Sequence, residues 1–335
     1  MTHASHRFSR RTALLATLLL AAGVATAQTA ASKPLTLIVP YPAGGLSDAV
    51  ARVIERPLGK ALGQMVIVEN IGGVGGAIAA QKMLAAPADG GMIYQGSPNE
   101  LILTPMALQA VKYKSEDFRL LQIVGAAPMA VVVRKDLPAE NIDEFVALAR
   151  KSAAAGKPLT YGSVGVGSLY HVLGEHFAQQ IEAPMTHVPY KGGAPLGQDL
   201  AGGVLDVSFI TVGAQQVALA EQGRIKILGT LAPAGKVEAP FLKRYPSIND
   251  SKSVKSFNYT LWTGFFVPKA TPEPVAQALH KALTTAMADP EVIKQLELIG
   301  NVPLAPLSLT DAAKEYEAQT ARYRAIAKAI KLAAQ

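Results

Sequence analysis

Strand-like and helical stretches alternate along the chain, and this alternation constrains the fold more than any other feature. Residues 35–39 form an apolar, β-branched run that stops at Pro40, and apolar residues at helical spacing follow it. Residues 65–68 and 92–95 repeat the strand-like pattern, with an alanine-rich helical stretch between them. Buried strands separated by helices predict an α/β fold, in which a mostly parallel sheet is flanked by helices on both faces.

A second set of the same plan occupies the middle of the chain. It opens with a long apolar strand at 123–134, and Asn141 with Glu144 three residues later predicts a capped helix start. The chain is longer than a single core usually supports, so we expect two domains. Further strands are predicted at 159–161, 185–188, 204–210, 225–231 and 262–267, and a long connecting loop at 232–256. The predicted division is residues 1–27 as a signal peptide, 28–125 plus 233–335 as one domain, and 126–232 as the other.

The first 27 residues have the pattern of a secretory signal peptide. A basic start with Arg7, Arg10 and Arg11 precedes an uncharged run at 12–24, which ends in Ala-Thr-Ala at Ala27. The run is shorter than the roughly 20 residues that cross a bilayer, which leaves a buried N-terminal helix as the alternative. Residues 9–14 also resemble a twin-arginine signal, so Sec and twin-arginine export both remain open. We expect a soluble periplasmic protein, cleaved near Ala27.

Composition excludes several functional classes. Cysteine is absent, so the chain has no lipid-anchoring cysteine, no disulfides and no thiol nucleophile. Residues 1–27 hold three arginines and no acid, so their removal takes the formal charge from +7 to +4. The chain contains no basic run with interleaved aromatic residues, so nothing in it predicts a nucleic-acid surface. We expect no cofactor and no metal.

Two glycine-rich loops are the candidate binding elements. The first loop (residues 40–48) and the second loop (residues 161–168) each join the end of a predicted strand to the start of a helix. Ligands of open α/β sheets bind at that edge, and the free N–H groups of a first helical turn favour an anion. A carboxylate held between the loops is the functional reading. The alternative is that Gly, Ser and Asp act only as turn and cap residues, with Asp48 either capping its helix or accepting N–H groups of the first loop.

The candidate enzymatic motifs in the chain do not have the residue spacing that catalysis or cofactor binding requires. Gly73 and Gly75 suggest a dinucleotide loop, but Ile78 stands where the third glycine is needed. A nucleophile elbow has the pattern Gly-x-Ser-x-Gly, and around Ser163 its first position is Tyr161 instead of glycine. His171 and His176 are five residues apart instead of four, and we interpret His176, His187 and His280 as structural. We therefore expect a binding protein and not an enzyme, with a periplasmic hydrolase as the weakest alternative.

An ordered series of motifs resembles the receptors of the tripartite tricarboxylate transporters, also called Bug proteins. The series is 37–45 with Asp48, 68–70 leading into 72–76, 161–163 leading into 167–168, 187–192, Gly203 with 205–207, and 289–292. The resemblance implies a periplasmic binding protein of two α/β domains joined by crossing strands, which close on a small carboxylate like a flytrap. It also implies delivery to membrane transporter subunits, or signalling to a membrane partner as a sensor, without a reaction.

One departure from the family pattern bears on the ligand. Many members carry an acidic residue after the strand that ends near Ile210, and this chain has Thr211 there. We interpret this as a ligand without a cationic amine, either a di- or tricarboxylate or an aromatic acid. Separately, we expect the receptor to be a monomer. The predicted ligand-binding residues are Tyr41, Ala43, Gly44, Ser47, Asp48, Ser97, Ser163, Val164, Gly165, Gly167, Ser168, His171 and Thr211.

Overall fold

The computed structural model of the chain describes residues 33–237 and 239–329. The predicted signal peptide, residues 1–27, lies outside the described residues. From Pro34 onward, the described residues form one compact unit. Within the described ranges, no helix has the length and apolar character needed to cross a bilayer.

One sheet of ten strands runs through the described part of the chain. Its main order is β2-β1-β3-β9-β4-β7-β5-β6, and β8 and β10 also pair with β4. The strands are β1 (Leu35–Val39), β2 (Val66–Asn70), β3 (Met92–Gly96), β4 (Phe118–Arg134), β5 (Thr160–Ser163), β6 (Thr186–Pro189), β7 (Val207–Thr211), β8 (Ile225–Thr230), β9 (Thr260–Pro268) and β10 (Val302–Pro303).

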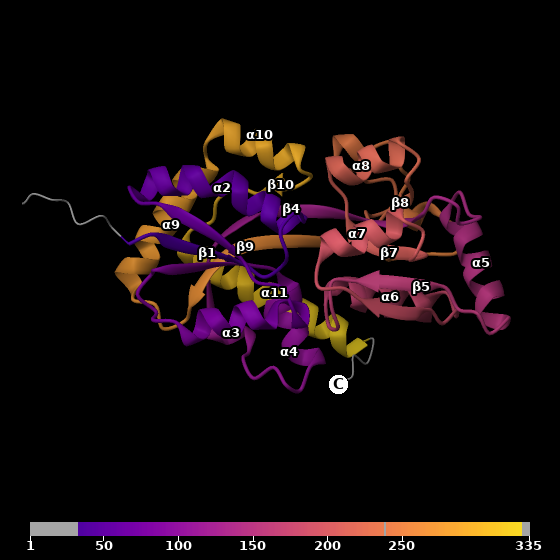
Figure 1. Cartoon of the computed structure of the whole chain (residues 1–335), viewed down its shortest axis with the longest axis horizontal. Helices are drawn as coiled ribbons and strands as arrows, with labels where there is room; N and C mark the ends of the chain where they lie inside the picture. The colour runs from indigo at the N-terminus through magenta and orange to yellow at the C-terminus, as the bar shows by residue number, and fades with distance from the viewer. Residues whose placement is uncertain (1–32, 238, 330–335) are drawn as a thin grey trace, which may run out of the picture. The chain divides into compact units, whose positions relative to one another are not determined.

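Two groups of parallel strands make up this sheet, and two long strands join them. The first group is β2, β1 and β3, and the second group is β6, β5 and β7. β4 pairs antiparallel with β9 through residues 118–128 and with β7 through residues 129–133, so it belongs to both groups (Figure 1). The predicted α/β sheet with flanking helices is confirmed, and β4 and β9 are its crossing strands.

Helices pack on the sheet through their apolar stripes. α2 buries Val50, Ile54 and Leu58 fully, and it packs on β1, β2 and α9. Burying each such side chain contributes about 1.5–3 kcal/mol relative to exposure. The helices are α2 (Leu46–Leu62), α3 (Ala77–Ala85), α4 (Thr104–Ala107), α5 (Ile142–Ala154), α6 (Leu169–Gln180), α7 (Gly193–Ala201), α8 (Ala214–Glu221), α9 (Glu273–Met287), α10 (Pro290–Leu298) and α11 (Leu309–Ala329), with short turns η1 (Val74–Gly76), η2 (Asn99–Leu103), η3 (Ser115–Asp117), η4 (Pro240–Leu242) and η5 (Ile248–Asp250).

Two elements differ from the sequence-based expectation. β4 begins at Phe118 and not near residue 123, because its first residues pair with β9, a partner more than 100 positions along the chain. The predicted loop at 232–256 contains the 3₁₀ turns η4 and η5, and the Thr230 N–H donates to the Pro246 carbonyl at 2.8 Å. The division into two domains near residues 125 and 232 stays a prediction.

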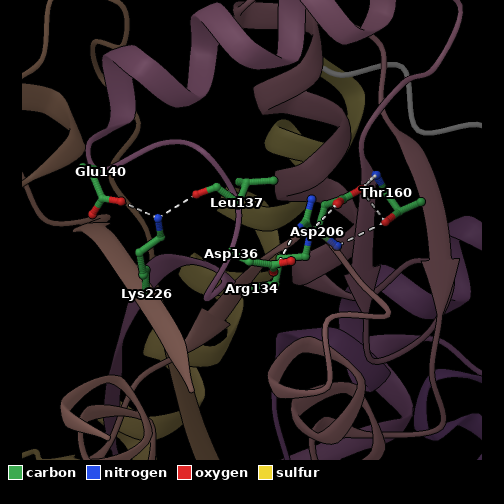
Figure 2. A network of polar contacts seen from close by, with 7 residues as sticks. All are labelled: Arg134, Asp136, Leu137, Glu140, Thr160, Asp206 and Lys226. Carbon is green, nitrogen blue, oxygen red and sulfur yellow. Dashed lines mark hydrogen bonds and ion pairs between the residues drawn. The ribbon is translucent and has the colours of Figure 1, made fainter. Parts of the chain in front are cut away.

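A polar network fastens the starts of the second group's strands. The Arg134 guanidinium contacts Asp206 at 2.8 Å and Asp136 at 2.7 Å. The other Asp206 oxygen accepts the Thr160 N–H and hydroxyl at 2.8 and 2.9 Å. Figure 2 shows this network beside Lys226, which donates to the Leu137 carbonyl. Asp206 thus joins β4, β5 and β7 at the ends of β5 and β7 opposite the second loop.

Candidate ligand-binding site

The first loop connects β1 to α2 in the left-handed turn that its glycine permits. Gly44 has φ +86°, and its N–H donates to the Asp48 carboxylate at 3.0 Å. The N-cap of α2 is Gly45, which offers no side chain to the free N–H groups of the first turn. Asp48 therefore orders the loop instead of capping the helix, and Arg52 holds its other oxygen at 3.3 Å. The α2 N-terminus is left free to bind an anion.

A buried acid, Glu100, accepts hydrogen bonds from Tyr41 and Ser97 beside the first loop. Glu100 is fully buried in η2, a π-helical turn that follows β3. The Tyr41 hydroxyl and the Ser97 hydroxyl each donate to its Oε2 at 2.9 Å, and the Ser97 N–H donates to its Oε1. Burial raises the pKa of Glu100 to about 7, against the opposing effect of these donors. The acid thus fixes two side chains whose hydroxyl groups stand at the site.

Asn99 links the two strand groups directly. Its amide Nδ2 donates to the Tyr41 hydroxyl at 3.3 Å, and its Oδ1 accepts the Leu169 N–H at 2.7 Å. Leu169 is the first residue of α6 in the second group, and Tyr41 follows β1 in the first. The side chain of Asn99 is almost fully buried. This contact joins the two sides of the site through one residue.

The polar side chains of the second loop form hydrogen bonds with the loop's own backbone. The Ser163 hydroxyl accepts the Gly165 N–H at 3.1 Å, and Ser168 caps α6 by accepting the His171 N–H. His171 Nδ1 accepts the Gly167 N–H at 3.1 Å. The predicted helix start at Ser168 is confirmed. The side chains of Ser163, Ser168 and His171 stabilise the shape of the loop and do not line the cavity.

The second loop also packs closely on the first strand group. A Cβ at Gly165 would lie 2.8 Å from the Gly75 Cα, and Gly165 has φ +138°. A Cβ at Gly167 would lie 2.5 Å from the Ala107 side chain and 3.1 Å from the Thr104 Cα. Only glycine allows backbone to approach this closely. The two loop glycines therefore provide a second close contact between the groups, besides that of Asn99.

A cavity of about 610 Å³ lies between the first loop, the Ser97 turn and the second strand group. Its size is typical of small-molecule sites. None of the described residues that line it is acidic. The lining consists of Tyr41, Ala43, Gly44, Gly45, Leu46, Ser47, Ser97, Asn99, Val164, Tyr170, Gly193, Ala194, Leu196, Gly197, Gln198, Leu200, Ala201, Ile210, Thr211, Gln215, Gln216, Leu219, Arg224, Ile225, Leu261 and Thr263.

Thr211, at the end of β7, pairs with Tyr170 on one wall of the cavity. Its Oγ1 lies 2.8 Å from the Tyr170 hydroxyl, which also accepts the Thr211 N–H at 3.2 Å. Both residues line the cavity, and both are buried. This wall therefore presents a neutral pair of hydroxyl groups.

The cavity separates the predicted site residues into two sets. Those that line it come from the first loop, the Ser97 turn, the tip of the second loop and the end of β7: Tyr41, Ala43, Gly44, Ser47, Ser97, Val164 and Thr211. Those outside its lining shape the loops: Asp48, Ser163, Gly165, Gly167, Ser168 and His171.

Sequence reasoning missed the walls made by the sides of helices. Asn99 stands two residues after Ser97 in the same turn, and this proximity was a usable signal. The α7 and α8 faces gave no such signal, because they carry ordinary apolar and amide side chains. Tyr170 lies in the first turn of α6, one residue before the predicted His171.

A serine–histidine pair lies behind the second loop. The Ser163 hydroxyl is 2.7 Å from His187 Nε2, and His187 stacks on His171 with ring centroids 4.1 Å apart. Burial lowers the pKa of His187 to about 4, and burial also lowers the pKa of His171. Ser163 is fully buried and does not line the cavity. The pair is therefore a packing and hydrogen-bonding element of the loop.

The described ranges contain no cluster of three or more His, Asp or Glu residues able to hold a metal ion.

Solved structures place this arrangement in a class. The periplasmic binding protein BugD is 26% identical, with a TM-score of 0.81, over 91% of this chain and 99% of its own. An R. palustris protein solved with adipate is 27% identical, with a TM-score of 0.82, over the same shares of the two chains. The chain is thus an α/β protein with the periplasmic-binding-protein fold.

A family model narrows the class. Residues 50–332 match the model described as "Tripartite tricarboxylate transporter family receptor". The "UPF0065 protein in the TAR-I ttuE-ttuC' intergenic region" of Agrobacterium vitis is 34% identical over 94% of this chain and 89% of its own length. The chain belongs to this receptor family. It is a solute-binding receptor, the class that the sequence predicted in place of an enzyme.

Proposed function

We propose that the receptor binds a small organic carboxylate in the 610 Å³ cavity. The observation that carries this proposal is the uncapped first turn of α2, whose residues Gly45, Leu46 and Ser47 line the cavity with no acidic side chain in the lining. Free N–H groups at a helix start favour an anion. The R. palustris relative solved with adipate supports the same ligand class.

The ligand is proposed to lack a cationic amine. Thr211 and Tyr170 pair with one another where an acid would face such a group, and the remaining lining offers no carboxylate. A buried ammonium group without a charged partner is costly. Plain organic acids therefore fit this wall better than amino acids.

The two strand groups are proposed to act as two domains, residues 28–125 plus 233–335 and residues 126–232. The first loop lines the cavity from one side, and Val164 and Thr211 line it from the other. We expect a ligand to contact both sides together only when the cleft is closed. A ligand that contacts both sides shifts the population toward the closed state. The Asn99 contact to Leu169 supports closure of the same interface.

The site of action is proposed to be the periplasm, after removal of residues 1–27, with the receptor acting as a monomer that delivers its ligand to membrane transporter subunits. BugD is described as a periplasmic binding protein, and the family name refers to a tripartite transporter. The signal-peptide pattern of the first 27 residues agrees with export.

A thermal-shift screen tests the ligand class. We expect organic acids to raise the melting temperature of the chain lacking residues 1–27, because a ligand present at about 100 times its Kd adds about 2.7 kcal/mol of stability. The matched control is the methyl ester of each acid, which should leave the melting temperature unchanged. Equal shifts with acids and esters, or calorimetry showing no acid binding, would contradict the proposal.

A further inference from the structure

Arg224 stands at a fixed place on the wall of the cavity. It follows α8 and precedes β8, and the chain turns there through Gly223, which has φ +65°. The Gly223 N–H donates to the Ala220 carbonyl at 3.0 Å, and the Arg224 N–H donates to the Leu219 carbonyl at 2.9 Å. Paired bonds of this kind close a helix end and fix the direction of the next residue. The backbone therefore anchors the arginine beside the cavity.

The guanidinium group of Arg224 has no acidic partner in the described part of the chain. Glu221, three residues earlier, pairs instead with Arg244 at 2.7 Å. Among the described residues that line the cavity, Arg224 alone carries a charge. A guanidinium stays charged at any physiological pH and offers five N–H donors. A lining residue with a positive charge and no acidic partner suits an anionic ligand group.

The wall shared by α7, α8 and β8 is mainly apolar. Leu196 and Leu200 of α7, Leu219 of α8 and Ile225 of β8 line the same cavity as Arg224. The uncapped α2 N-terminus and Arg224 belong to different strand groups, so they are two separate anion-binding elements of one cavity. Apolar walls with two separate anion sites fit a carbon chain that carries a carboxylate at each end.

We propose that Arg224 binds a second carboxylate of the ligand, so that the receptor selects dicarboxylates over monocarboxylates with the same carbon skeleton. This inference rests on the proposed carboxylate-binding function and specifies its substrate class. A guanidinium can bind a carboxylate through two parallel N–H···O bonds. Arg224 is exposed, so water screens part of the attraction. Its main effect is discrimination between ligands.

Calorimetry with paired ligands tests this assignment. Succinate is compared with butyrate, and adipate with hexanoate, on the unmodified chain without residues 1–27 and on Arg224→Gln, Arg224→Lys and Arg322→Gln. The last variant removes the same charge from α11, whose residues do not line the cavity. Arg322 is exposed and serves as the matched control for the change in net charge.

The expected result is a dicarboxylate preference that Arg224→Gln reduces by about fivefold, the value of an exposed ion pair, with monocarboxylate affinity unchanged. Arg224→Lys should retain part of the preference, and Arg322→Gln should retain all of it. Equal affinity of the unmodified chain for both members of each pair, or an equal loss for both in Arg224→Gln, would overturn the role of Arg224. Binding of monocarboxylates with no such preference would leave the carboxylate-receptor function intact, whereas no binding of any acid would contradict that function.

Discussion

At the scale of single residues, the protonation state of the Glu100 carboxyl affects the residues that line the cavity. It does not line the cavity, but Tyr41 and Ser97 both do, and both donate to its carboxylate. Burial raises the pKa of this acid to about 7, so it changes charge near neutral pH. Burial also raises the pKa of the neighbouring Tyr94 and Tyr113, which therefore stay neutral.

The pH dependence of carboxylate affinity follows from this arrangement. An anionic ligand raises the pKa of Glu100 further, so binding takes up a proton, and Kd should rise between about pH 6 and pH 8 by at most about tenfold per unit. Calorimetry across this range measures the effect, with Glu100→Gln as the comparison. The variant should show a flat profile, and equal slopes in both proteins would count against the role of Glu100.

The protonation of Glu100 also affects the stability of the protein, and the direction of that pH dependence can be derived separately. A carboxyl whose pKa is raised in the folded state binds a proton more tightly there than in the unfolded chain. Its contribution is complete below the ordinary pKa, near 4.5, and is lost as pH rises through about 7. The unmodified chain should therefore lose stability relative to Glu100→Gln across that window.

At the scale of elements, the Asp206 network fixes β4, β5 and β7 to one another. Asp206 accepts three hydrogen bonds from Arg134 and Thr160, and it is mostly buried beside them (Figure 2). Asp136 contacts the same guanidinium but is largely exposed. The two acids therefore share a partner and differ in solvent exposure, which makes them a matched pair.

Replacing Asp206 by Ala should lower the free energy of unfolding by about 2 kcal/mol, because charged hydrogen bonds are lost and the Thr160 donors keep no partner. Asp136→Ala should cost less than about 1 kcal/mol, as exposed ion pairs do. Denaturant unfolding of both variants measures the difference. Equal losses would show that Asp206 does not act through this network.

The elements also show what the sequence could predict. Local signals were sufficient for the starts of α5 and α6, where Asn141 and Ser168 cap as expected, and for the place of the first loop after β1. The second loop follows β5 as expected, but its hydroxyl groups bond to its own backbone, and its Gly165 packs on Gly75, a residue of another segment. The cavity wall of α7 and α8 depends on such long-range packing, which spacing along the chain does not encode.

At the scale of the whole molecule, β9 and β4 lie between two parallel strand groups in the sheet, and the cavity lies where the loops of these groups meet. Family membership defines the chain as a transporter receptor, and the geometry adds how its parts contribute. The first group supplies the uncapped start of α2, and the second supplies Thr211 and Arg224. Under the proposed function, we expect a ligand held by both groups to stabilise a closed state of the receptor.

A crystal structure with the tightest-binding acid from the thermal screen tests the central claim most directly. We predict that one carboxylate accepts N–H groups from the first turn of α2, at residues 45–47, while the rest of the ligand contacts the wall around Thr211. Hydrogen-bond distances of about 2.7–3.2 Å would meet this prediction. A ligand bound outside the cavity, or one with its carboxylate turned away from α2, would contradict it.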